Sequence, residues 1–72
     1  MKMIKGQKYS IRNIERYANM NNLLFFEKGE KKIKNHLITL SNSNGDKDID
    51  LLLTETSING YIYECIHSDM EE

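Results

Sequence analysis

Three aspartates follow an Asn-Gly pair at every second position in the stretch SNSNGDKDID, residues 41 to 50. Carboxylates at this spacing could bind calcium or, if clustered, act in acid–base catalysis. An EF-hand loop, however, has oxygen ligands before its glycine and a bidentate glutamate six residues after it. Here Gly45 comes before the aspartates, and the sixth residue after it is Leu51. We therefore expect a polar turn that leads into a strand, and no metal site.

Sulfur and imidazole side chains are the next candidates for chemistry, because Cys65, His67 and His36 could together bind zinc. Cys65 and His67 are two residues apart, which puts them on one face of a strand. With a two-residue turn at Asn59-Gly60, the strand register places both of them on the face opposite to His36. A reactive thiolate also needs cationic neighbours, whereas Glu64 adds negative charge beside Cys65. We expect a partly buried structural thiol.

Catalysis has little support elsewhere in the chain. The four glycines form no phosphate-binding loop, and no pair of carboxylates stands in an apolar setting suited to general acid catalysis. We therefore expect a non-enzymatic protein that acts by binding, without a cofactor or metal ion.

Length and composition indicate a single small domain over residues 1–72, with 39% hydrophobic and 29% charged residues. One cysteine cannot form an internal disulfide. MKMIKGQKY lacks the apolar segment of a secretory signal, and no apolar run approaches the roughly 20 residues that span a bilayer. We expect a cytoplasmic protein without membrane contact. Ile, Asn and Lys make up 25 of the 72 residues, a bias typical of AT-rich coding in bacteria and their phages.

Charge is distributed unevenly along the chain. Residues 1–36 hold nine Lys/Arg and three Glu, whereas residues 37–72 hold one Lys and eight Asp/Glu. The two halves could neutralise each other across adjacent strands or between copies. The basic half could instead bind the phosphates of a nucleic acid. The residues that this alternative requires are Arg12, Arg16, Lys28, Lys31, Lys32 and Lys34.

Helical spacing of Ile11, Ile14 and Ala18 predicts a helix over residues 11–20. Ser10 is a suitable N-cap, because its hydroxyl can accept a hydrogen bond from an amide of the first turn. Asparagines at 19, 21 and 22 favour the end of the helix, since they are poor helix formers that tolerate a left-handed backbone.

After residue 22 the hydrophobic period changes to two, which predicts strands separated by short turns. With Asn44-Gly45 as a two-residue turn, pairing of Leu40 with Ile49 and of Ile38 with Leu51 makes one face of the hairpin almost entirely apolar. The sequence thus predicts an α+β fold, with one N-terminal helix packed on a four- to five-stranded antiparallel β-meander. The predicted strands are 23–27, 33–41, 48–55 and 61–67, and MKMIK is a candidate fifth strand at an edge.

The second face of this sheet is also apolar. With KGEK as a four-residue loop, Phe26 pairs with Ile33, and one ten-residue helix cannot cover both faces of the sheet. We expect the uncovered face to contact another protein, through self-association as a homodimer or as a phage or mobile-element inhibitor of a host protein. Alternatively, the MKMI segment or a different loop register covers that face. The expected contact residues are Phe26, Ile33, Leu37, Leu52, Tyr61 and Tyr63.

Overall fold

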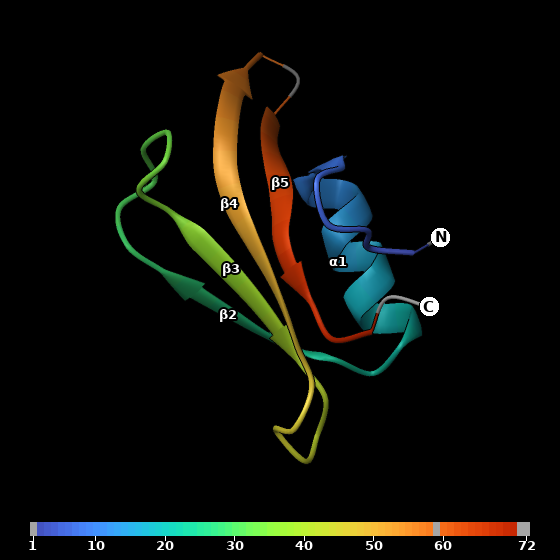
Figure 1. Cartoon of the computed structure of the whole chain (residues 1–72). Helices are drawn as coiled ribbons and strands as arrows, with labels where there is room; N and C mark the ends of the chain where they lie inside the picture. Colours follow the sequence, from blue (N-terminus) through green and yellow to red (C-terminus); the bar gives the residue numbers. More distant parts are fainter. Residues whose placement is uncertain (1, 59, 71–72) are drawn as a thin grey trace.

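Over residues 2–58 and 60–70, which the computed structural model describes, the chain forms one helix and five antiparallel strands in a single sheet. The strand order is β1-β5-β4-β3-β2, so β2 to β5 form a meander and β1 pairs with β5 (Figure 1). This confirms the predicted α+β fold with an N-terminal helix. The elements are β1 (Lys8–Ser10), α1 (Ile11–Met20), β2 (Leu24–Lys28), β3 (Leu37–Ser41), β4 (Asp48–Ser57) and β5 (Gly60–Ser68).

Helix α1 has the predicted bounds because its caps are local. The Ser10 hydroxyl accepts a hydrogen bond from the Asn13 amide at 3.2 Å, as expected for an N-cap. Two residues after the last turn, Asn22 adopts a left-handed backbone with φ 55°, which ends the helix. The buried face of α1 consists of Ile14, Tyr17 and Ala18.

The β3–β4 hairpin has the predicted register, with Leu40 opposite Ile49. Its turn is wider than the two residues expected, because the Asn42 amide donates to the Lys47 carbonyl at 3.2 Å and encloses four residues. The Asn42 side chain also accepts from two backbone amides of the loop. Gly45 supplies the positive φ of 75° within it. The aspartates therefore belong to a polar turn and strand entry, as predicted.

The β2–β3 connection differs from the prediction. Phe26 pairs with Thr39 rather than Ile33, and residues 29–36 form a loop, so the strand expected from residue 33 begins at Leu37. No periodic pattern in the sequence predicts the contact that holds this loop. A ring nitrogen of His36 lies 3.1 Å from the carbonyl oxygen of Gly29. This contact, together with the bond from the Lys34 amide to the Leu53 carbonyl of β4 at 2.7 Å, replaces the tight turn that KGEK alone suggested.

The β4–β5 register is also shifted from the prediction. Asn59, in the expected turn, lies outside the described residues, and Gly60 pairs with Ser57. Register irregularities occur between Asp50 and Leu51 and between Leu53 and Glu55. An extra residue at a bulge changes which side chains face the core. As a result, Cys65 lies on the same face as His36, contrary to the expectation that they would be opposed.

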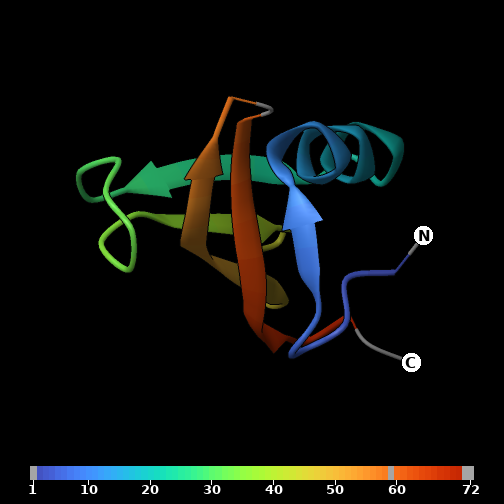
Figure 2. The same ribbon diagram turned by 90° about the horizontal axis from the view of Figure 1, so that it is seen from above.

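The N-terminal segment packs on the helix side of the sheet. Met3 is 1% exposed and belongs to the core cluster, whereas the edge strand is Lys8–Ser10 rather than MKMIK. The alternative in which MKMI covers the second face of the sheet is therefore wrong. Figure 2 shows the sheet strongly twisted, with β2 and β3 running across β4 and β5, and α1 beside the start of β2. The core lies between α1 and the sheet face that it covers, and comprises Met3, Ile14, Tyr17, Ala18, Ile38, Leu40, Ile49, Leu51, Leu53, Tyr63 and Cys65.

Candidate functional site

The sheet face that points away from α1 carries apolar side chains at half exposure. Strand alternation turns Leu24 and Phe26 outward, and they are 49% and 53% exposed. On the neighbouring strands, half-buried Leu37 pairs with half-buried Leu52. These four residues, Leu24, Phe26, Leu37 and Leu52, are called the outer apolar patch below.

Charged side chains of opposite sign lie on opposite sides of the outer apolar patch. The row through its centre runs from Lys28 across the two leucines to Glu64 on β5. On the next pair of residues that faces the same way, the Thr39 hydroxyl donates to a carboxylate oxygen of Asp50 at 2.7 Å. Positive charge therefore borders the patch on β2, and negative charge borders it on β4 and β5.

The predicted contact residues do not all share this face. Phe26, Leu37 and Leu52 lie on it, and Ile33 is in the loop 29–36 with 51% exposure. Tyr61 and Tyr63 instead point to the helix side, because the β4–β5 bulge changes their register. Tyr63 is 0% exposed, so its place in a contact surface is wrong.

Basic residues proposed for nucleic-acid binding are split between two regions. Arg12 and Arg16 are exposed on α1, whereas the lysines lie at the end of β2 and in the loop 29–36. Figures 1 and 2 show this loop and α1 on opposite sides of the molecule. Two loop lysines also face carboxylates, with Lys31 3.9 Å from Glu27 and Lys32 3.0 Å from Glu30. The six residues Arg12, Arg16, Lys28, Lys31, Lys32 and Lys34 therefore form no single surface.

A buried histidine lies between a half-exposed carboxylate and a buried tyrosine at the β2–β3 end of the sheet. His36 is 2% exposed, with Nδ1 3.1 Å from the Gly29 oxygen and Nε2 3.1 Å from Glu27 Oε1. A carbonyl only accepts, so Nδ1 donates to Gly29, and Nε2 lies within hydrogen-bond distance of the Glu27 carboxylate. With so little exposure, the imidazole cannot meet a substrate. Its contacts fasten the loop 29–36 to β2.

Tyr63 lies beside this pair, with its ring centroid 5.9 Å from that of His36. Its hydroxyl is buried and has no hydrogen-bond partner among the residues that the structure describes. Burial raises the pKa of Tyr63 to about 12, and the nearby Glu27 carboxylate adds to the rise. The hydroxyl is therefore a protonated, unsatisfied group in the core.

Cys65 is fully buried, and its thiol lies 3.5 Å from the carbonyl oxygen of His67. Its burial agrees with the structural thiol expected from the sequence, and exceeds the partial burial predicted. Within residues 2–58 and 60–70, no group of three or more His, Cys, Asp or Glu side chains is arranged to hold a metal ion.

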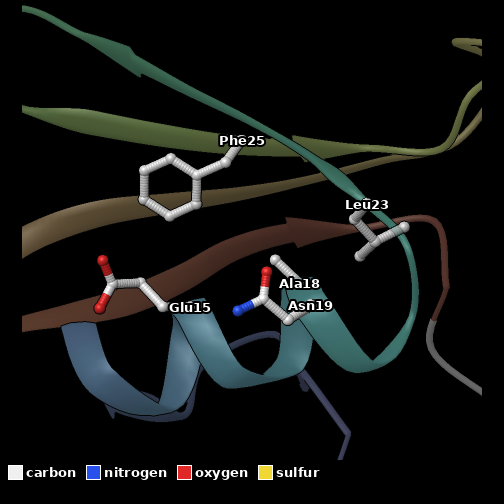
Figure 3. Close-up of a pocket in the computed structure, with 5 residues that line it drawn as sticks. All are labelled: Glu15, Ala18, Asn19, Leu23 and Phe25. Carbon is white, nitrogen blue, oxygen red and sulfur yellow. The ribbon is translucent and has the colours of Figure 1, made fainter.

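The structure has a groove between α1 and β2 that the sequence did not predict. It encloses about 400 Å³ and is lined by the exposed Glu15 and Asn19, together with three less exposed residues. Figure 3 shows the Phe25 ring turned toward α1, with the Glu15 side chain across from it. No motif marks such a groove, because it depends on β2 being the outermost strand and on where α1 ends. The full lining is Glu15, Ala18, Asn19, Leu23 and Phe25.

Comparisons with known proteins give no match, whether with family models, curated sequences or solved structures. In the part of the chain that the structure describes, no helix has the length and apolar character required to cross a membrane. The geometry and chemistry of the outer apolar patch and of the groove therefore carry the functional proposals.

Proposed function

We propose that this protein is a non-catalytic interaction module that associates with a second copy of itself through the outer apolar patch. The observation that carries the proposal is the half exposure of Phe26 and Leu24 on a sheet face that α1 does not cover. Clustered apolar side chains on a protein surface usually mark a protein contact. Met3 packs in the core on the helix side, so the N-terminal segment does not cover the outer apolar patch.

Charge order around the patch favours a second copy as the partner. Lys28 borders the patch on β2, whereas Asp50 and Glu64 border it on the far side. When two outer faces pack about a two-fold axis parallel to the strands, the basic side of each copy lies over the acidic side of the other. Such a contact buries about 800 Å² per copy. This is a modest share of the total accessible surface of 4881 Å².

Two narrower statements belong to the same proposal. A cytoplasmic location is supported by the lone cysteine, which cannot form an internal disulfide. A role as a phage or mobile-element inhibitor of a host protein would use the same kind of surface, and is supported by small size and AT-rich composition.

Sedimentation velocity over a range of concentrations tests the self-association. We expect a dimer that Phe26→Asp dissociates without changing the circular dichroism spectrum, because the carboxylate would be buried against the other copy. Met20→Asp is the matched control: Met20 is 76% exposed at the end of α1, away from the patch. A wild-type protein that stays monomeric at the highest concentration reached would refute the proposal.

Nucleic-acid binding remains the alternative, with less support from the separated basic residues. A filter-binding titration with single-stranded and duplex DNA and RNA at low salt tests it. Affinity that falls steeply with added salt would favour it, whereas absence of binding would end it.

A further inference from the structure

Strand β2 is the last strand of the sheet, and the hydrogen-bond pattern fixes which of its backbone groups are unpaired. In a strand, the N–H and C=O of one residue point to the same side, and successive residues alternate. On both flanks of β3, the even-numbered residues bond toward β4: the Asn42 amide donates to Lys47, and the His36 carbonyl accepts from Leu53. The odd-numbered residues of β3 therefore bond toward β2.

The partners of these odd-numbered residues are Leu24, Phe26 and Lys28. Phe25 and Glu27 consequently direct their backbone N–H and C=O groups away from β3, to the free edge. An independent contact confirms the alternation, because the amide of Leu23 donates to the Ala18 carbonyl of α1 at 2.9 Å. The end of α1 thus pairs with the edge at residue 23, and leaves it open at residues 25 and 27.

The open edge borders the groove between α1 and β2. Ala18, Leu23 and Phe25 give the groove an apolar lining, and Glu15 and Asn19 supply polar groups on the helix. Exposed donors and acceptors in a row at an edge are a template for another strand. A ligand that fits both features has an extended peptide backbone, which pairs with the open edge, and side chains, which enter the groove.

We propose that the groove binds an extended segment of another protein, which adds to the sheet as a sixth strand beside β2. The backbone groups of Phe25 and Glu27 pair with the segment in an antiparallel ladder. An apolar side chain of the segment enters the lining, and a basic side chain two residues away lies near Glu15. The groove faces the helix side of β2, so this site is separate from the outer apolar patch and does not depend on self-association.

Hydrogen exchange of the protein alone gives the first test. We expect the amides of Phe25 and Glu27 to exchange rapidly and the amide of Phe26, which is bonded to β3, to be protected. Protection of all three amides at a concentration where sedimentation shows a monomer would overturn the proposal, since no free edge would then exist.

A peptide titration followed by amide NMR gives the second test. The probe is acetyl-Thr-Ile-Thr-Lys-Thr-amide, which places Ile and Lys on one face of a strand. We expect saturable shifts at the Phe25 and Glu27 amides with a Kd of about 1 mM or tighter, and slower exchange of both. A control peptide N-methylated at Ile and Lys cannot donate from those positions, and should not bind.

Two groove variants and one control complete the design. Asn19→Trp fills the groove from an exposed helix position and should abolish peptide binding, whereas Met20→Trp, outside the groove, should not. Glu15→Lys should weaken binding roughly fivefold, the effect of one exposed ion pair. The proposal is overturned by equal binding of the N-methylated peptide, by shifts confined to the outer apolar patch, or by no shift up to the solubility limit of the peptide. These outcomes leave the dimer test unaffected.

Discussion

Replacement of Tyr63 by Phe should stabilise the protein, an unusual result for a fully buried residue. The Tyr63 hydroxyl has no hydrogen-bond partner among the described residues. Burial of an unsatisfied polar group costs about 1–3 kcal/mol. Loss of the oxygen leaves a void of about 15 Å³, which at about 24 cal/mol per Å³ costs about 0.4 kcal/mol. The free energy of unfolding should therefore rise by about 0.6–2.6 kcal/mol.

Urea and thermal denaturation at neutral pH measure this effect. In a domain of this size a gain of 1 kcal/mol raises Tm by about 4–8 °C. Tyr9→Phe is the matched control, because the Tyr9 hydroxyl oxygen accepts from the Ile4 amide at 2.8 Å. The control should lose about 0.5–1.5 kcal/mol. Destabilisation by Tyr63→Phe as large as by Tyr9→Phe would show that the core hydroxyl is satisfied.

The same variant has a signature at high pH. The pKa of Tyr63 is about 12 in the folded protein, against the ordinary tyrosine value of 10.0. Between these two values the folded state holds a proton that the unfolded state has lost, so stability falls as pH rises from 10 to 12 and is unaffected below 10. Tyr63→Phe removes that contribution. The stability gap between variant and wild type should therefore widen with pH over this window, and a constant gap would contradict the assigned pKa.

Three further predictions concern single side chains and glycines of the fold. Glu27→Ala should lower the free energy of unfolding by about 1–3 kcal/mol in urea denaturation, because Nε2 of His36 loses its partner, whereas Glu27→Gln should retain part of that stability. Hydrogen bonds, chiefly from a β4 amide, lower the pKa of Asp69 below 3.8. The carboxylate of Asp69 thus contributes to the free energy of unfolding above pH 3.8, and this contribution is lost as pH falls further. Asp69→Asn should remove this pH dependence from acid denaturation curves. Gly29→Ala should destabilise the fold more than Gly45→Ala in thermal denaturation, since both have positive φ but only at Gly29 does an added Cβ overlap a backbone oxygen.

The parts of the fold that sequence reasoning predicted are those specified by neighbours along the chain. α1 begins at the N-cap Ser10, which bonds to Asn13, and ends where Asn22 takes a left-handed backbone. Both features involve only residues close together in the chain. The alternation of apolar residues on β3 and β4 fixes the register, because a shift of one residue would expose the whole apolar face. Leu40 therefore lies opposite Ile49 even though the turn is wider than expected.

The incorrect predictions depend on contacts between distant residues. The bond from the Lys34 amide to the Leu53 carbonyl of β4 holds the loop 29–36 beside the contact between His36 and Gly29, and no periodic pattern in the sequence encodes it. The β4–β5 bulge places Tyr63 in the core. The residue type did not reveal this, because Tyr is common in both exposed and buried positions. The position of Phe26 on the outer face was predicted, because it needs only alternation along β2. The groove needs the strand order as well, which a single sequence does not specify.

The pairing of β1 with β5 determines how this protein can mature on the ribosome. Tyr9 pairs with Tyr63, and β5 lies between β1 and β4 although it is the last strand to be synthesised. Until β5 emerges, the nascent chain has two unfinished sheet edges and no site for Met3 beside it. The sheet can therefore be completed only once β5 is available, and this step is slow to nucleate because its contacts close long loops. A translational stall shortly before residue 60 would leave an aggregation-prone fragment rather than a smaller folded domain.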